Sequence, residues 1–239
     1  MLPENHAVAR TLRAGKPVRD GVFDQVYPDD VRRVSARFWT PVDVALTASR
    51  WLTSIGAHSV LDIGSGAGKF CIVTSLASGQ NLASVTGVEQ REQLIDAAKA
   101  ANTHYEAKAQ YLHGTIESID PGPYDAFYLF NPFGENLYAP DEQFDTGPAL
   151  SALRYLHDLS IFEHWLDSAP AQTAFLTYHG FGGRIPNNYT LLKAQNKGSD
   201  QLRLWRKTRA GSADSFTLET DAVHAPEVQS LPVRVARKR

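Results

Sequence analysis

Short apolar runs alternate along this chain with longer segments in which apolar residues recur every three or four positions. Runs that are apolar throughout, instead of alternating with polar residues, predict buried strands of a parallel sheet. The strand-like runs are 59–63, 84–89, 110–113, 124–130 and 172–178, with two more at 189–195 and 201–207. The segments with helical periodicity are 41–55, 70–76, 90–109 and 147–166. This pattern predicts a doubly wound α/β fold with a mostly parallel seven-stranded sheet, helices on both faces and a C-terminal hairpin.

The two ends of the chain differ in character from this alternation. Residues 1–37 are polar and interrupted by proline and glycine, so we expect irregular structure or short helices that form an arm or lid. Residues 38–210 are predicted to form the main domain. Residues 211–239 are predicted to be a weakly ordered basic tail, in which 215–223 has enough strand character to add an edge strand.

The composition limits the class of protein. Of the 239 residues, 43% are hydrophobic and 21% are charged, which excludes a disordered or fibrous protein. The single cysteine, Cys71, excludes an intramolecular disulfide and a four-thiolate zinc site, and it favours a reducing compartment. No apolar window reaches the roughly 18 residues of a membrane span, and the N-terminal residues lack the apolar core of a signal peptide. We therefore expect a cytoplasmic protein without a membrane segment or a metal site.

The formal net charge of −2 hides an uneven distribution. Residues 1–50 carry a net charge of +2, residues 51–183 carry −10, and residues 184–239 carry +6. The basic residues thus lie in the flanks, and we expect the flanks to meet a substrate. A total of 24 basic against 26 acidic residues is not the strongly basic composition of a nucleic-acid-binding domain. A nucleic-acid partner stays open on this evidence, and we expect a monomer or a dimer.

A glycine-rich turn follows the first strand-like run, with the sequence DIGSGAG at 62–68. Glycines in such a turn supply positive φ values and allow a ligand to approach the backbone. The turn leads into a helix, whose first N–H groups face a polar or anionic ligand. Because ligands of open α/β sheets bind at the carboxyl ends of the strands, this segment predicts a ligand site.

The spacing of the glycines bears on which ligand binds there. A dinucleotide fingerprint has glycine at the first, third and sixth positions of the turn, and the sixth position here is Lys69. A loop that binds nucleoside triphosphates needs a hydroxyl residue after Gly-Lys, where this chain has Phe70. Both phosphate-binding interpretations are therefore weakened.

The pattern Asp-x-Gly-x-Gly-x-Gly, with Glu89 at the end of the second strand, resembles the class I, Rossmann-fold methyltransferases that use S-adenosylmethionine, in a bacterial-type subgroup with an Asn-Pro-Phe loop. The resemblance covers about residues 38–208. It implies that the glycine turn packs against the methionine part of the cofactor and that Glu89 binds both ribose hydroxyls. A carboxylate suits that role because its two oxygens accept from two neighbouring donors. The implied cofactor-binding residues in this part of the chain are Asp62, Gly64, Ser65, Gly66, Gly68, Glu89 and Gln90.

Two further segments gain roles from the same resemblance. After the third strand, many family members have an acid that binds the adenine amino group, and Thr115 stands at that position here. Adenine recognition then falls to the Thr115 hydroxyl or to the backbone N–H of Ile116. Thr40 and Pro41 are similar to a Thr-Pro segment that folds over the carboxylate end of the cofactor. An N-cap threonine before a helix-starting proline explains the same two residues without a ligand.

The fourth strand runs into Asn131, Pro132 and Phe133, the candidate catalytic residues, and Asn131 is also a candidate cofactor-binding residue. They resemble the Asn/Asp-Pro-Pro-aromatic motif of methyltransferases that act on planar nitrogens, and also the Asn-x-Phe loop of Rossmann-type protein lysine methyltransferases. The resemblance implies that Asn131 accepts hydrogen bonds from the target amino group while Phe133 stacks on its plane, so that positioning supplies most of the catalysis. One proline stands where the first motif has two, and Glu135 is a candidate base. A simple turn without a catalytic role accounts for the same residues.

We therefore expect direct methyl transfer from S-adenosylmethionine to an amino or amide nitrogen. His179, which follows the fifth strand, is a further candidate on the substrate side. Two alternatives stay open: a nicotinamide-dependent oxidoreductase of Rossmann type, and a protein that keeps the cofactor-binding fold without catalysis. The resemblance does not identify the acceptor, because this fold serves small molecules, proteins and nucleic acids alike.

Overall fold

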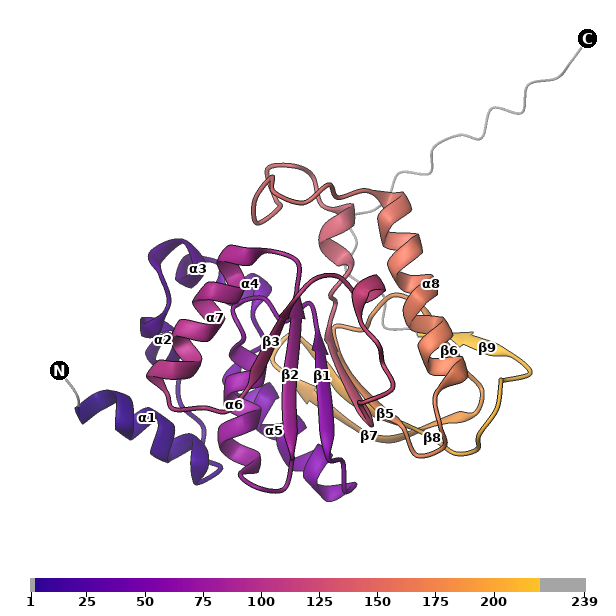
Figure 1. Ribbon diagram of the computed structural model, residues 1–239, viewed down its shortest axis with the longest axis horizontal. Coiled ribbons are helices and arrows are strands. Elements are labelled where there is room, and N and C mark those ends of the chain that lie inside the picture. The colour runs from indigo at the N-terminus through magenta and orange to yellow at the C-terminus, as the bar shows by residue number, and fades with distance from the viewer. Residues whose placement is uncertain (1–2, 220–239) are drawn as a thin grey trace, which may run out of the picture.

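The computed structural model describes residues 3–219 and is built on a seven-stranded sheet with the order β3-β2-β1-β4-β5-β8-β7 (Figure 1). Neighbouring strands from β3 to β5 run parallel, whereas β8 is antiparallel to β5 and β7 is antiparallel to β8. This is the Rossmann-like, mostly parallel sheet with a C-terminal hairpin that the sequence pattern predicts. The strands are β1 (Ser59–Ile63), β2 (Ser84–Glu89), β3 (Gln110–His113), β4 (Ala126–Phe130), β5 (Ala174–Tyr178), β7 (Tyr189–Lys197) and β8 (Asp200–Lys207).

Helices cover both faces of the sheet. Helices α5, α6 and α7 pack on one face together with α1, and α8 covers the other face (Figure 1). The helices are α1 (Pro3–Arg13), α2 (Asp20–Phe23), α3 (Asp29–Arg33), α4 (Ser35–Phe38), α5 (Val42–Ser54), α6 (Lys69–Ser78), α7 (Glu92–His104) and α8 (Ala152–Ser168), with 3-10 turns η1 (Asp24–Val26), η2 (Ile116–Ser118) and η3 (Gly134–Leu137). Within residues 3–219, no helix is both long and apolar enough to cross a membrane.

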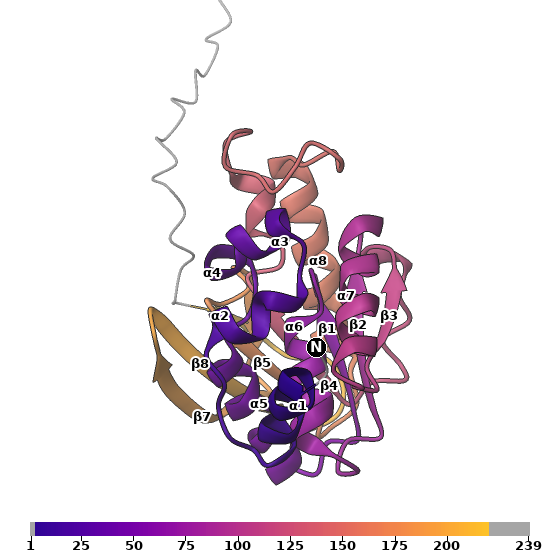
Figure 2. The ribbon, with the colours of Figure 1, turned by 90° about the vertical axis from the view of Figure 1, so that its left-hand side faces the viewer.

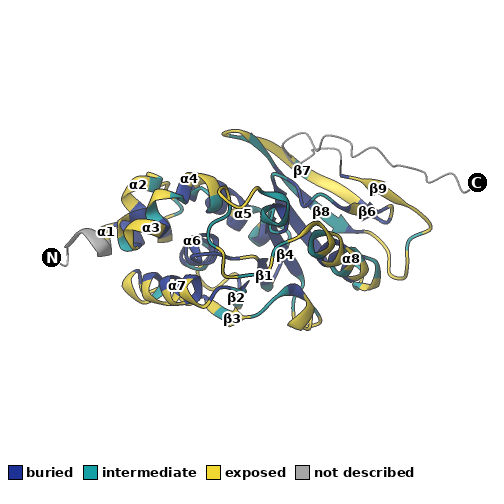
Figure 3. Cartoon of the chain, turned by 90° about the horizontal axis from the view of Figure 1, so that it is seen from above, coloured by how far each residue is buried: buried dark blue, intermediate teal, exposed yellow. Residues whose placement is uncertain are grey.

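The sheet separates two apolar cores, because successive side chains of a strand point to opposite faces. In β1, Val60 belongs to the core beneath α5 and α6, whereas Leu61 and Ile63 belong to the core beneath α8. Figure 3 shows the central strands as a buried layer between helices whose outer faces are exposed, whereas the edge strands β3 and β7 are largely exposed. Asp62 lies on the α6 side, where Cys71 Sγ donates a weak hydrogen bond to Asp62 Oδ2 at 3.4 Å.

The N-terminal segment is more regular than the sequence predicts. Helix α1 has 11 residues, and Leu12 from its last turn is fully buried in the same core as α6. Figure 2 shows α1 to α4 in front of α5 and α6. The segment is also fixed by Lys69 at the start of α6, whose ammonium lies 2.5 Å from Asp20 Oδ1 and 2.8 Å from Asp24 Oδ1. Residues 7–37 are therefore packed on the sheet domain through apolar contacts and the ion pairs of the buried Lys69.

Two helix boundaries differ from the predicted ones by five residues, and the others by at most two. The predicted helix 147–166 begins at Ala152, because the Ser151 hydroxyl accepts a hydrogen bond from Arg154 N at 3.1 Å and acts as the N-cap. The predicted helix 90–109 ends at His104, and Glu106 just beyond it has a left-handed φ of 53°.

The C-terminal end departs from the prediction as well. The strand expected within 215–223 is β9 (Phe216–Leu218), which pairs antiparallel with the short β6 (Arg184–Pro186) outside the main sheet. Residues 220–239, which include most of the predicted basic tail, lie outside the described residues.

The strand order positions the site. From β1 the chain builds β2 and β3 on one side and then returns to place β4 and β5 on the other side. Such a reversal leaves a crevice at the carboxyl ends of the two central strands, since their following loops diverge. The glycine turn after β1 and the Asn131 loop after β4 therefore lie side by side.

Candidate functional site

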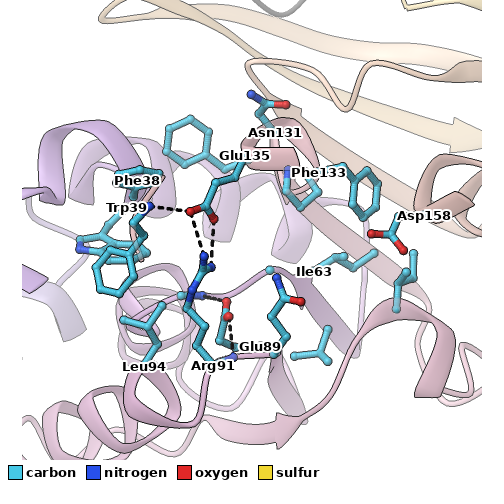
Figure 4. Close-up of a pocket in the computed structure, with 18 of the residues that line it drawn as sticks. Phe38, Trp39, Ile63, Glu89, Arg91, Leu94, Asn131, Phe133, Glu135 and Asp158 are labelled. Atoms are coloured by element: carbon cyan, nitrogen blue, oxygen red, sulfur yellow. Dashed lines mark hydrogen bonds and ion pairs between the residues drawn. The ribbon is translucent and has the colours of Figure 1, made fainter. Parts of the chain in front are cut away.

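A cleft with a volume of about 290 Å³ lies at the carboxyl ends of the parallel strands (Figure 4). This volume is close to the lower limit of the roughly 300–1,000 Å³ typical of small-molecule sites. The walls come from the turns after β1 to β5, from α8, and from residues 36–39 in and just after α4. Segments that are far apart in the sequence therefore meet at one site.

The glycine turn has the backbone conformation that the sequence predicts. Gly64 and Gly66 line the cleft with φ values of 71° and 53°, whereas Gly68, with φ 76°, caps α6 outside the cleft lining. A Cβ on Gly66 would lie 2.3 Å from Trp39 Cζ3, and one on Gly68 would lie 2.5 Å from the Tyr111 hydroxyl. The turn thus needs glycine for close packing of the protein's own side chains as well as for its positive φ values.

Asp62 and Ser65 support the turn but do not line the cleft. Ser65 Oγ is buried without a hydrogen-bond partner among the described residues and packs against Gly87, where a Cβ would lie 2.5 Å away. Burial raises the pKa of Asp62 to about 8, the contact with Cys71 opposes that shift, and the charge of Glu89 adds to it. Asp62 is therefore predominantly protonated near neutral pH.

The raised pKa of Asp62 predicts a pH-dependent stability. Asp62 titrates near pH 8 in the folded protein against an ordinary value of 3.8, so its stabilising contribution is complete below about pH 4 and is lost as the pH rises through 8. Asp62→Asn should remove this dependence and leave a protein more stable than wild type at about pH 9. Urea denaturation at several pH values measures the effect, with the exposed Asp96→Asn as control. The same loss of stability with pH in wild type and Asp62→Asn would contradict it.

Glu89 ends β2, and its carboxylate faces the cleft (Figure 4). Oε2 accepts from Gly66 N at 3.0 Å, and Oε1 accepts from Arg91 N at 2.9 Å. Burial raises the pKa of this carboxyl, and the backbone hydrogen bonds from Arg91, Gly66 and Gln90 together with the Arg91 charge oppose the shift. A carboxylate offers about four acceptor positions. Each oxygen of Glu89 therefore retains capacity for an outside donor, and a pair of neighbouring hydroxyls would match both.

Gln90, Thr115 and Ile116 line the cleft together with Glu89, as the sequence predicts for neighbours at one sheet edge. Thr115 N donates to Ser118 Oγ at 3.2 Å, and this hydroxyl donates to Thr115 O at 2.8 Å. These bonds hold the turn after β3 in shape. The acid of that turn, Glu117, has an exposed side chain and is not part of the cleft wall.

Thr40 does not reach the cleft. Its hydroxyl lies 3.0 Å from that of Tyr128 in the core. The first N–H of α5, from Val42, donates to Asp20 Oδ1 at 2.9 Å, so a carboxylate of this chain already occupies that helix end. The N-cap interpretation is wrong as well, because Pro41 holds the N-cap position and no side chain caps the helix. Tyr128 and Asp20 come from distant segments, which local sequence does not reveal.

Asn131 follows β4 in a left-handed conformation with φ 40°. Its N–H donates to Gly180 O at 3.2 Å, which links the loops after β4 and β5. Its side chain lines the cleft, and Oδ1 is buried without a hydrogen-bond partner among the described residues. A Cβ on Gly134 would lie 2.3 Å from Asn131 Nδ2, so the glycine after the aromatic residue makes room for this amide. A buried, unpartnered acceptor is unfavourable and points to a ligand donor.

Pro132 and Phe133 shape the wall beside Asn131. Pro132 packs on the glycine turn, since a Cβ on Gly64 would lie 3.0 Å from Pro132 Cβ. Phe133 lines the cleft, is 4% exposed and belongs to the core beneath α8. Its ring is therefore fixed in the wall by packing.

An ion-pair network crosses the cleft, and sequence reasoning missed it. Arg91 donates from both terminal nitrogens to the Glu135 carboxylate at 2.9 Å each and from Nε to Asp145 Oδ1 at 2.8 Å (Figure 4). Phe144 N also donates to Glu135, at 2.6 Å, and its ring lies 5.8 Å from that of Trp39. Glu135, the candidate base, is thus held by Arg91 through both of its oxygens. These partners are 44 and 54 residues from Arg91, so no local pattern identifies them.

His179 lies on the β5 side of the cleft, with a left-handed φ of 61°. Its Nδ1 lies 3.2 Å from Asp200 Oδ2, and its Nε2 lies 3.1 Å from Ser199 Oγ. Ser199 belongs to the turn between β7 and β8, and Asp200 is the first residue of β8. The ring also lies 5.3 Å from that of Phe130. The hairpin thus holds the imidazole at the cleft, which the sequence suggested only through the position of His179 after a strand.

Two basic residues of the hairpin, where we expected contact with a substrate, instead bind groups of the protein itself. The Lys207 side chain is buried, and Nζ donates to the carbonyls of Leu166 at 2.9 Å and Asp167 at 2.6 Å. Lys197 Nζ pairs with Asp43 Oδ2 at 2.7 Å. The charge of the hairpin is therefore a poor guide to a recognition surface.

No protein-family model and no curated protein matches the chain. Among solved structures, it is similar to an RNA methyltransferase from Salinibacter ruber in complex with S-adenosyl-L-homocysteine, with 16% identity and a TM-score of 0.47 over 71% of this chain and 93% of that chain. It is also similar to the plantazolicin methyltransferase BpumL in complex with the same compound, with 19% identity and a TM-score of 0.43 over 72% and 61% of the two chains. Similarity this distant transfers neither an activity nor a substrate.

Proposed function

We propose that the cleft binds S-adenosylmethionine and that the chain is a methyltransferase that uses it. The observation that carries this proposal is the buried carboxylate of Glu89, which is fixed at the end of β2 with acceptor capacity left on each oxygen. The ribose of the cofactor presents two neighbouring hydroxyl donors, which match that pair of acceptors. The bond from Gly66 N to Glu89 also joins the ribose position to the glycine turn.

Other residues of the wall suit the remaining parts of the cofactor. Gln90 and Ile116 offer amide and apolar surface beside Glu89 for adenine, and the turn at Gly64 and Gly66 forms the adjoining wall for the methionine part. When bound, S-adenosylmethionine supplies a methyl group on a sulfonium sulfur. The protein's part is to orient an acceptor in line with that group and to keep water out.

We further propose that the acceptor atom is an amino or amide nitrogen. The buried Oδ1 of Asn131 is an acceptor without a partner among the described residues, and an N–H of the acceptor substrate would satisfy it. Such a hydrogen bond would orient the lone pair of the substrate nitrogen toward the methyl group. His179 lies in the same wall, held by Asp200 and Ser199, and suits the removal of the proton that the methylated nitrogen releases.

Lys69 argues against the nicotinamide-dependent alternative. It occupies the position where a dinucleotide fingerprint has its third glycine, and its side chain is 1% exposed. Its ammonium is paired with Asp20 and Asp24 on the side of the N-terminal helices. It therefore neither allows the close helix packing of a glycine nor offers a charge to a pyrophosphate.

Calorimetric titration of the full chain with S-adenosylhomocysteine tests the cofactor proposal. We expect saturable binding with a matching rise in melting temperature. Titration with NADH is the control for the oxidoreductase alternative. Absence of heat and of thermal shift at millimolar S-adenosylhomocysteine would overturn the proposal.

Asn131→Gly should lower methyl transfer by about 100-fold, because it removes an acceptor at the reacting group, while the positive φ of 40° is kept. Asn131→Asp retains acceptor oxygens and should lose less. The assay follows transfer of tritiated methyl from S-adenosylmethionine to a glutamine peptide, a lysine peptide and an adenine-containing oligonucleotide, and affinity for S-adenosylhomocysteine should change by less than about 3-fold. Unchanged turnover in Asn131→Gly would remove Asn131 from the mechanism.

A further inference from the structure

A carboxylate that the sequence resemblance does not use lies in the cleft wall. Asp158, in the middle of α8, is 5% exposed and lines the cleft with Ile63, Thr115 and Ile116. Figure 4 shows it beside Phe133, on the opposite side of the view from Trp39. From sequence alone, Asp158 and Arg154 form an (i, i+4) pair, a spacing typical of solvent-exposed helix faces.

The surroundings of Asp158 leave it able to accept a further hydrogen bond. Arg154 Nε donates to both carboxylate oxygens, at 2.8 Å and 2.9 Å. One N–H shared between two oxygens uses only a part of the roughly four acceptor positions of a carboxylate. Burial raises the pKa of Asp158, and the hydrogen bond and charge of Arg154 oppose that shift. A buried carboxylate with a single donor group is unfavourable unless another donor reaches it.

The position of α8 places Asp158 next to the turn after β3, which has Thr115 instead of an acid. Helix α8 packs on η2, and His157 Nε2 lies 3.7 Å from Glu117 Oε2 across that contact. Leu159 of α8 and Ile116 of η2 share one apolar core. The turn after β3 has Thr115 instead of an acid, and its own acid, Glu117, is exposed. Asp158 is thus a carboxylate in the wall that Thr115 and Ile116 also form.

We propose that Asp158 accepts a hydrogen bond from the exocyclic amino group of the cofactor's adenine and selects a 6-amino over a 6-oxo purine. This inference rests on the proposed binding of S-adenosylmethionine. A carboxylate favours an amino donor and repels a carbonyl oxygen, so a single residue gives selectivity in both directions. Thr115 lacks that selectivity, because a hydroxyl both donates and accepts.

The experiment compares S-adenosylhomocysteine with S-inosylhomocysteine, its 6-oxo analogue, by calorimetry on the full chain. Wild type should bind the adenine compound at least about 30-fold more tightly, since a buried polar group left unpaired or repelled costs about 2 kcal/mol or more. Asp158→Asn should weaken binding of S-adenosylhomocysteine by about 10-fold and strengthen binding of the 6-oxo analogue, because the amide can donate to the carbonyl. Glu117→Gln, a neighbouring exposed acid, is the matched control and should leave both affinities unchanged.

Two further variants separate this role from a structural one. Thr115→Val should keep the preference for the amino compound, whereas loss of the preference in Thr115→Val would assign it to Thr115. If Asp158→Asn unfolds, Arg154→Met/Asp158→Asn removes the ion pair as a unit and is titrated instead. Equal wild-type affinity for both compounds, or a preference that survives in the Asp158 variants, overturns the inference while binding of S-adenosylhomocysteine upholds the proposed function. Absence of binding of both compounds to wild type overturns the proposed function and this inference with it.

Discussion

Glu89→Ala is expected to weaken binding of S-adenosylhomocysteine by at least about 100-fold, because two hydrogen bonds to a charged acceptor contribute about 3 kcal/mol at the low end. The substitution also removes the acceptor for Gly66 N, so the glycine turn loses the bond that holds it against β2. Both effects act on the same ligand, one directly and one through the shape of the turn. Calorimetry with S-adenosylhomocysteine measures the loss.

Two variants make this test specific. Glu89→Gln keeps one amide oxygen and the shape of the side chain, so its affinity should lie between those of wild type and Glu89→Ala. Glu92→Gln changes an exposed acid in the first turn of α7 and should leave the affinity unchanged. If Glu89→Ala stays folded and binds within about 3-fold of wild type, Glu89 does not hold the ribose.

Lys69→Met is expected to lower the free energy of unfolding by about 3–5 kcal/mol, the usual effect of removing one partner of a buried ion pair. Lys69 is the buried cation between α6 and the N-terminal segment, and the side chain of Asp24 is only 5% exposed. Without the ammonium, Asp24 is left as a buried charge with no cation beside it, and the N-terminal helices lose one of their polar attachments. Urea denaturation measures the change.

The double variant Lys69→Met/Asp24→Asn separates charge from packing. It removes the stranded carboxylate, so it should recover a substantial part of the stability that Lys69→Met loses. Lys99→Met, at an exposed position of α7, should change stability by less than about 0.5 kcal/mol. A loss below about 1 kcal/mol in Lys69→Met, or a double variant no more stable than the single one, would show that the ion pairs do not hold the N-terminal segment.

Lys69 also illustrates what a motif can and cannot convey. At the sequence level, it is a residue that breaks the dinucleotide spacing. In the structure, it is the anchor for Asp20 and Asp24, which are 49 and 45 positions away. The lysine at this position of the glycine-rich segment is therefore explained by its contacts with the N-terminal segment.

The seven strands of the main sheet were predictable to within two residues, most clearly β1, β2, β4 and β5, which are compact runs rich in apolar residues. The runs 59–63 and 84–89 coincide with β1 and β2, and the glycine turn has the positive φ values that its composition implies. The start of α8 was less predictable, since its signal is a single hydroxyl, Ser151, within a loop rich in turn residues. For the N-terminal segment the sequence left irregular structure and short helices both open, because these helices derive their stability from burial against α6.

The sequence by itself determined the order of strands and helices, the glycine turn after β1 and the acid at the end of β2, because each depends on residues that are neighbours along the chain. Only the tertiary structure decided what surrounds them. In the folded chain, Arg91 pairs with Glu135 and Asp145, and Trp39 packs on Gly66. Asp158 of α8 lies in the cleft wall, whereas Thr40 lies in the core beside Tyr128. The physical reason is that these contacts join segments tens of residues apart, whose approach is fixed by burial of both faces of the sheet and not by any local preference.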